Sequence, residues 1–168
     1  MKKLNISIVV FLFISVFVAS CKKDGFNGLT DVKPTIPVTV PNATEFRPTP
    51  AVRASKAAGG GITITLQVPS GHVINEITKV AASTNYNAVQ NATTVGTSSS
   101  QLYKAGPFAG NGSNQITFTT SISEYMTRTG TASTPASNTE LARQFYFVLS
   151  VDNGQVIIPE PVRVVVTD

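Results

Sequence analysis

The sequence is poor in the residue types from which metal and catalytic sites are built. Its 168 residues include one cysteine, one histidine, nine acidic residues and no tryptophan. A single cysteine cannot form a disulfide bond within the chain, so the core must be held by packing alone. The acidic residues are scattered and form no calcium-binding D-x-D-x-D-G loop, so we expect neither a metal site nor a cofactor.

Positive charge is also too sparse to indicate a nucleic-acid partner. The chain has 13 basic and 9 acidic residues, which gives a net charge of +4. Two of the basic residues, Lys2 and Lys3, lie in the first twenty, and without that segment 11 basic residues oppose the same 9 acidic ones. The remaining charge of +2 is near balance, and no cluster of Lys and Arg marks a binding face.

The first twenty residues have the composition of a secretion signal. Lys2 and Lys3 are followed by an apolar stretch over residues 4–18. As a helix this stretch would be about 22 Å long, short of the ~30 Å hydrocarbon core, so a permanent transmembrane helix is disfavoured. We therefore predict a signal peptide over residues 1–20.

The four residues that end this segment resemble the lipobox of bacterial lipoproteins. Val18 supplies the aliphatic residue, Ala19 and Ser20 the two small ones, and Cys21 follows. The resemblance implies that the Cys21 thiol receives a diacylglycerol and that cleavage leaves Cys21 as the acylated (palmitate-bearing) N-terminus, anchored in a lipid bilayer. The alternatives are an uncleaved N-terminal anchor, or an ordinary signal peptide with Cys21 left free.

The N-terminus also looks like that of Bacteroidota lipoproteins, in which acidic residues after the cysteine mark export to the outer face of the outer membrane. Here Asp24 stands alone among lysines. The resemblance implies an outer-membrane lipoprotein and leaves open whether it faces the surface or the periplasm.

A proline-rich tether is predicted between Cys21 and the folded domain, over residues 21–58. Half of the ten prolines fall between Pro34 and Pro50, which favours an extended chain over helix. Residues 36–40 are a possible first strand at a sheet edge, where proline is tolerated.

The folded domain is expected to begin at Gly59 and to run to residue 168. Residues 62–68 alternate apolar and polar side chains, the pattern of a half-buried strand, and Pro69-Ser70-Gly71 supplies a turn. Residues 73–86 have both helical and strand spacing, and we interpret them as a strand because valine and threonine recur.

The middle of the domain is polar, and its elements are less clearly marked. Residues 85–114 are too long for an unstructured loop, so we expect a short edge strand near residues 101–104. Another strand is predicted at residues 116–119. Ser121 and Glu124 have capping-box spacing, which predicts a helical turn through Met126 that crosses between sheets, before a loop over residues 127–139.

The last quarter predicts a β-hairpin. Apolar residues 145–151 and 156–166 flank Asn153-Gly154, a strong turn signal, and the first run would place Phe145, Phe147, Leu149 and Val151 on one core-facing side. A two-residue loop would pair Pro159 with Val148 where a donor is needed. We therefore expect a bulge, a longer loop or a strand break at residues 158–161, on an edge strand.

This C-terminal pattern of an aromatic strand, a turn, prolines and a Val-x-Val tail resembles the last two strands of fibronectin type III and related immunoglobulin-like domains. The likeness covers about twenty-five residues. The absence of tryptophan departs from the family, whose core usually holds an indole. The evenly spaced short strands independently favour an all-β, two-sheet antiparallel sandwich.

Few residues are candidates for catalysis. His72 would have to serve any Ser/His/Asp site, but it follows a turn and is more simply a solvated loop residue. A glycosidase needs a carboxylate pair, whereas the glutamates lie on different predicted elements: Glu76, Glu124, Glu140 and Glu160.

A set of aromatic residues could bind a ligand if loops bring them together. Tyr86, Tyr103, Phe108 and Tyr125 could form a platform for sugar stacking, although core packing is the simpler interpretation. The anchor, the tether and the lack of catalytic groups favour a non-catalytic lipoprotein that binds a protein partner or glycan at the cell envelope, or acts as a spacer there. The alternative is a small hydrolase or ligand carrier that uses His72.

Overall fold

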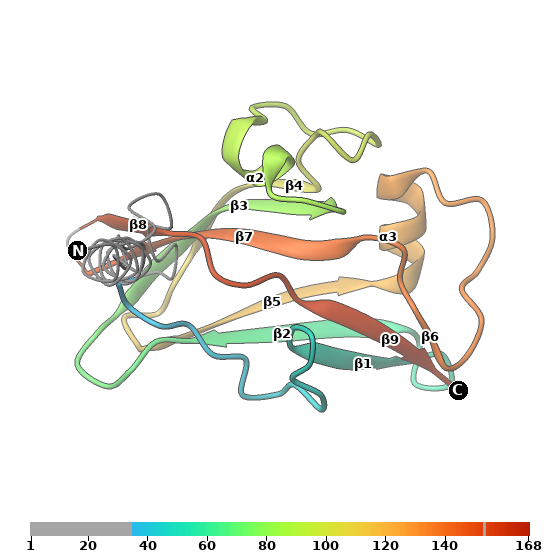
Figure 1. Ribbon diagram of the computed structural model, residues 1–168, viewed down its shortest axis with the longest axis horizontal. Helices are drawn as coiled ribbons and strands as arrows, with labels where there is room; N and C mark the ends of the chain where they lie inside the picture. The colour runs from blue at the N-terminus through green and yellow to red at the C-terminus, as the bar shows by residue number, and fades with distance from the viewer. Residues whose placement is uncertain (1–34, 153) are drawn as a thin grey trace, which may run out of the picture. The chain divides into compact units, whose positions relative to one another are not determined.

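The computed structural model describes residues 35–152 and 154–168, and this part of the chain has a β-sandwich-like, all-β fold (Figure 1). The predicted signal peptide, Cys21 and the first part of the tether lie outside the described residues. The strands are β1 (Ala51–Ser55), β2 (Gly61–Gln67), β3 (Ile74–Ser83), β4 (Lys104–Ala109), β5 (Gln115–Ser121), β6 (Thr139–Glu140), β7 (Gln144–Val151), β8 (Gln155–Ile157) and β9 (Arg163–Thr167). Two short helices, α2 (Asn87–Asn91) and α3 (Ile122–Thr129), connect them.

The strands form three hydrogen-bonded sheets. The first pairs β2 with β5, the second has the order β4-β3-β7-β8, and both are antiparallel. In the third, with the order β1-β9-β6, β1 runs parallel to β9. Figure 1 shows the β2–β5 pair lying below β3 and β7, so that the first two sheets face each other across the core.

The core lies between the faces that the period-two pattern predicts. In β2 the alternate residues Ile62, Ile64 and Leu66 are fully buried. From the opposing sheet, Phe147 of β7 meets Phe118 of β5 with ring centroids 5.6 Å apart. All four residues predicted on the core-facing side of β7 are fully buried, which confirms that prediction.

The other face of β7 is buried as well, which no pattern within the strand itself predicts. Tyr146 and Val148 pack there in a second apolar cluster with Ala88 and Val89 of α2 and with Leu102. The cluster explains why the polar segment between β3 and β4 is ordered: its few apolar residues cover the outer side of the central sheet. Residues 73–86, which we interpret as a strand, form β3 over most of their length.

The hairpin departs from a regular two-residue-loop ladder near Pro159 in two ways that the sequence predicts. Val151 pairs with Gln155, so the connection is longer than a two-residue loop. Strand β8 ends at Ile157 and the next strand begins at Arg163, so the prolines lie in a break. Strand β8 is also at the edge of its sheet, as expected.

The compact unit extends N-terminal to the expected boundary at Gly59. It includes β1, which pairs with β9, and Thr39, which makes one antiparallel bridge to Gln67 at the edge of β2. Ile36 and Val40 are buried in the core. The possible first strand at residues 36–40 is therefore an edge contact of one residue pair, and Gly59 lies inside the folded unit. Pairing of β1 with the distant β9 has no local sequence signal.

The predicted helical turn is confirmed as α3. The Ser121 hydroxyl accepts a hydrogen bond from the Glu124 N–H at 3.1 Å, and Gly130 ends the helix in the left-handed conformation. Strand β5 before the helix and β6 after it belong to different sheets, so α3 crosses between sheets as expected. The edge strand predicted near residues 101–104 is β4, which begins at Lys104 and runs to Ala109. The prediction places it too early because Gly106 and Pro107, which are unusual in strands, lie in its middle.

Candidate functional site

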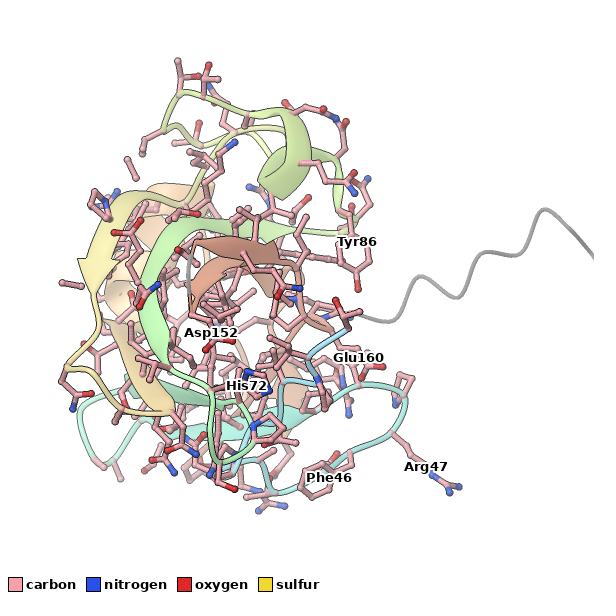
Figure 2. All side chains as sticks on the ribbon, turned by 90° about the vertical axis from the view of Figure 1, so that its left-hand side faces the viewer. Phe46, Arg47, His72, Tyr86, Asp152 and Glu160 are labelled. Atoms are coloured by element: carbon pink, nitrogen blue, oxygen red, sulfur yellow. The ribbon has the colours of Figure 1, made fainter. Side chains whose placement is uncertain are left out.

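The single histidine lies beside a carboxylate at one end of the sandwich. His72 belongs to the turn between β2 and β3, and Asp152 begins the loop between β7 and β8. Figure 2 shows the two side chains next to each other. The His72 Nδ1 atom lies 2.6 Å from Asp152 Oδ2, and both side chains are roughly one third exposed.

Asp152 joins the two turns through almost every polar group it has. Its Oδ1 atom accepts from the Val73 N–H at 2.9 Å, and its own N–H donates to the Val73 carbonyl at 2.9 Å. The Asp152 carbonyl accepts from the Asn75 side chain at 2.5 Å. The hydrogen bonds from His72 and from the Val73 N–H lower the pKa of Asp152 below its ordinary value.

This geometry provides a histidine and a carboxylate but no nucleophile. Within residues 35–152 and 154–168, Asp152 is the one side chain in hydrogen-bond contact with the His72 ring. Acyl transfer by such a pair needs a hydroxyl or thiol on the other imidazole nitrogen. The observed contacts therefore fit a clasp between two turns, in which the carboxylate also satisfies the backbone N–H of Val73.

We expect Asp152→Asn to lower the melting temperature at neutral pH, because the variant loses the charged acceptor for His72. The pKa of Asp152 is depressed in the folded protein, so its contribution is present above the unfolded-state pKa near 3.8 and is lost as the pH falls through the folded value. The difference in melting temperature between wild type and variant should therefore shrink in acid. Calorimetry across pH tests this, and equal melting temperatures at pH 7 would refute the clasp. His72→Ala removes the same contact from the other partner and should also lower the melting temperature.

The four candidate ligand-binding aromatics do not gather on a surface. Tyr103 and Tyr125 are almost fully buried, and both rings lie against Phe145. Phe108 is partly buried and its ring lies 5.9 Å from that of Phe118. Tyr86 packs edge-to-face on Tyr146 on the other side of the central sheet and stays 38% exposed.

The two buried tyrosines therefore serve the core. The Tyr103 hydroxyl contacts Thr120 Oγ1 at 2.6 Å, and burial raises the pKa of Tyr103 to about 12. The Tyr125 hydroxyl accepts from the Arg143 N–H at 3.0 Å, and burial raises its pKa too. The platform hypothesis is not supported by these positions, because only Tyr86 offers a sizeable exposed face. Burial and the nearby Glu160 carboxylate raise the Tyr86 pKa.

A charged cluster around Glu124 attaches α3 to the edge strands. The carboxylate accepts from Lys104 Nζ at 2.9 Å, from Arg128 Nε at 2.8 Å and from Thr120 Oγ1 at 2.8 Å. Burial by itself would raise the pKa of Glu124, but these three donors outweigh it and lower the value to about 2. In the sequence Glu124 shows only its capping-box spacing with Ser121, and the contribution of Lys104, twenty residues away, has no local signal.

Glu124→Gln should destabilise the fold by about 1 to 2 kcal/mol at pH 7, less than the full pKa shift implies because the side chain is one third exposed to water. The carboxylate stabilises the fold above its ordinary pKa of 4.5, and this contribution is lost as the pH falls towards 2. Urea unfolding at pH 7 and pH 2.5 measures the difference. Glu76→Gln, on a glutamate with no ion pair among the described residues, is the control. An unchanged difference at both pH values would contradict the role of the ionised carboxylate.

Arg163 of β9 is the buried charge of the described chain. Its guanidinium donates to the Arg47 carbonyl at 2.7 Å and to the Thr49 carbonyl at 2.9 Å, and it forms an ion pair with Glu140. The Arg47 and Thr49 carbonyls belong to a proline-rich segment that is not part of a named strand. Arg163 is therefore best explained as the residue that attaches this segment to β9.

The glutamates considered for glycoside hydrolysis occupy separate elements. Glu76 is on β3, Glu124 on α3 and Glu140 on β6, and Glu160 lies between β8 and β9. No group of three or more His, Cys, Asp or Glu side chains in the described residues could hold a metal ion. In that same part of the chain, no helix is both long enough and apolar enough to cross a bilayer.

The outer face of the β2–β5 sheet carries only hydroxyl and amide side chains. The alternating sequence of β2 predicts a polar outer side for that strand, but it does not predict which strand continues the face. Across the pair, Thr63 lies opposite Thr119 and Thr65 opposite Thr117, and the last two hydroxyls are 3.2 Å apart. Gln67 lies opposite Gln115. No charged residue interrupts this face.

No protein-family model, curated protein or solved structure gives a match to this chain.

The contact between the turn residues His72 and Asp152 is not predicted from the sequence. His72 and Asp152 are 80 positions apart, and a signal for their contact could have come only from the prediction that the β2–β3 turn and the β7–β8 hairpin share one end of a sandwich.

Proposed function

We propose that the chain is a non-catalytic lipoprotein of the outer membrane whose immunoglobulin-like domain acts as a binding or spacer module for a protein partner or glycan at the cell envelope. The observation that carries this proposal is the position of the one cysteine, Cys21, directly after Val18-Ala19-Ser20 and the apolar segment. Several acyl chains on Cys21 would hold the domain on a bilayer far more firmly than one could.

The strand order supports the immunoglobulin-like part of the proposal. The β2–β5 sheet faces the β4-β3-β7-β8 sheet, and the chain passes from β5 through α3 and then through β6, in the third sheet, to β7. This alternation between sheets is how Greek-key sandwiches are connected. The resemblance to fibronectin type III domains lacks the usual tryptophan, and here the rings of Tyr103, Phe118 and Phe145 fill the core.

The use of polar groups inside the fold supports the non-catalytic part. Asp152, Glu124 and Arg163 each satisfy backbone groups or neighbouring elements. A catalytic carboxylate or base needs an acceptor or donor that remains free to meet substrate. A surface that acts by contact needs no such group.

Protease treatment of whole cells, followed by crosslinking and co-purification through the tethered domain, tests the proposal. Loss of the domain on treatment of intact cells would place it on the outer face, and protection until the outer membrane is opened would place it in the periplasm. A glycan array tests the carbohydrate alternative with the same material. A chain found neither at the cell surface nor in the periplasm would contradict the proposal.

The 2.6 Å contact between His72 and Asp152 favours one alternative, a small hydrolase or ligand carrier that uses His72. Assays with ester, peptide and glycoside substrates would distinguish it. Hydrolysis that disappears in His72→Ala while the fold is retained would support the enzyme, and equal rates in the two proteins would exclude it.

A further inference from the structure

Among the described residues, strand β5 has backbone N–H and C=O groups without a partner on the side away from β2. The Val68 N–H donates to the Asn114 carbonyl and the Ile122 N–H to the Gly60 carbonyl, so the even-numbered positions of β5 turn their backbone groups towards β2. In an antiparallel ladder the alternate positions turn theirs the other way. Thr117 and Thr119 therefore direct their N–H and C=O groups to the opposite edge.

The two edges of the β2–β5 sheet differ in the hydrogen-bond partners of their backbone groups. On the β2 side, Thr39 pairs with Gln67, and the Asn42 side chain accepts from the Thr65 N–H and donates to the Thr63 carbonyl. On the β5 side, the Ser113 hydroxyl serves Gln115 at one end. Within the described residues, no group bonds to the backbone of Thr117 or Thr119 on that side.

The other exposed edges, those of β4, β8 and β6 and that of β1 with its central Arg53, carry features that discourage strand addition. Strand β4 contains Pro107, which has no N–H, and β8 is three residues long and is followed by Pro159. Strand β6 has two residues. By contrast β5 is seven residues long, QITFTTS, without proline, charge or a break in its register with β2. Long uncharged edges of this kind are templates for pairing with another strand.

The first part of β5 borders an open hollow. A hollow of about 310 Å³ is lined by Ala109 at the end of β4 and by Gln115, Ile116 and Thr117 of β5. None of its lining residues belongs to β2, so it lies on the free side of β5.

We propose that β5 pairs with β5 of a second copy of this chain, antiparallel about a two-fold axis at Phe118. This register sets Thr117 of one copy opposite Thr119 of the other, so that the two outward-directed residues exchange backbone hydrogen bonds in both directions. The sequence is self-compatible, because no like charges meet and threonine faces threonine. The outer threonine face of the sheet, where Thr65 already contacts Thr117, would continue across both copies.

The strength of this contact rests on the proposed function. One pair of short strands buries less surface than a stable dimer in solution needs. Copies anchored to one bilayer are held near each other, which raises their effective concentration. Pairing is therefore expected on the membrane and is weak or absent in dilute solution.

Disulfide trapping in cells tests the register. Full-length chains carrying Thr117→Cys and chains carrying Thr119→Cys, with different tags, are co-expressed and oxidised mildly. Directly opposite residues in a hydrogen-bonded pair lie about 5.5 Å apart between Cα atoms, within disulfide range. We expect a mixed dimer of doubled mass, and its absence would overturn the register. Thr63→Cys mixed with Thr119→Cys is the control, since Thr63 lies on the same face away from the edge.

Charge variants test the pairing itself. The reporter is a disulfide between Gln115→Cys in one copy and Ser121→Cys in the other, two positions that the same two-fold axis sets opposite each other. In this background the double variant Thr117→Lys/Thr119→Glu should keep the crosslink, because lysine in one copy meets glutamate in the other. Thr117→Lys/Thr119→Lys should lose it, because lysine meets lysine. Equal crosslinking in both would overturn the proposal, and circular dichroism shows whether both fold.

The wild-type chain, whose one thiol is at Cys21, separates this proposal from the proposed function. A crosslink in wild type would mean that Cys21 is free, and recovery of the chain in the soluble fraction would mean that it is not anchored. Either result counts against the lipoprotein, whereas the strand contact is judged by the introduced cysteines in whichever fraction holds the chain.

Discussion

Replacing Cys21 with serine should abolish incorporation of a fatty-acid label into the chain and leave residues 1–20 attached. A serine hydroxyl cannot form the thioether through which lipoproteins carry diacylglycerol, and in that family cleavage follows lipidation. The effect should be all or none, because no other cysteine can substitute. Labelling with an alkyne-bearing palmitate analogue and gel mobility measure the two outcomes together.

Ser20→Ala is the matched control for that experiment. It exchanges one small residue for another immediately before Cys21 and should leave labelling and processing at the wild-type level. If Cys21→Ser incorporated label normally, the anchor would be elsewhere and the resemblance to a lipobox would be misleading.

Replacing Phe145 with alanine should destabilise the fold by about 3 to 5 kcal/mol, the cost of deleting a large buried ring. Phe145 is fully buried, and its ring centroid lies 5.3 Å from that of Tyr103, 5.9 Å from Phe118 and 6.0 Å from Tyr125. Without a disulfide, this packing carries the stability of the core. Urea denaturation followed by circular dichroism measures the free energy of unfolding.

Phe46→Ala removes the same ring from a surface position and serves as the comparison. Phe46 is 65% exposed and projects from the segment before β1 (Figure 2), so its loss should change stability by no more than about 0.5 kcal/mol. Similar losses in the two variants would show that the β7 face does not form the centre of the core.

The parts of the fold that sequence predicts are those with local signals. The alternation in β2, the apolar run of β7, the Ser121 cap of α3 and the conflict at Pro159 all follow from residues close together in the chain. Each has a physical cause that acts over a few residues, so each can be read without knowing the topology.

The parts that sequence does not predict depend on contacts across the chain. The parallel pairing of β1 with β9 joins segments more than a hundred residues apart, and it moves the start of the folded unit ahead of Gly59. Burial of Tyr146 and Val148 depends on α2, which covers a face that alternation alone would leave exposed.

The candidate sites show the same division. The position of Cys21 is a purely local signal, and its chemistry lies outside the described residues. The contact of His72 with Asp152, the cluster around Glu124 and the burial of Tyr103 and Tyr125 require the assembled sandwich. An aromatic or carboxylate residue in an isolated segment does not reveal whether it faces solvent or core.

Mass spectrometry of the N-terminal peptide of the protein purified from its membrane is the most direct test of what the chain is. A peptide that starts at Cys21 and carries the added mass of a diacylglycerol agrees with a domain held on a bilayer by lipid. A peptide that continues through Ser20 into an unmodified cysteine would contradict the lipid anchor at Cys21, on which the proposed lipoprotein rests.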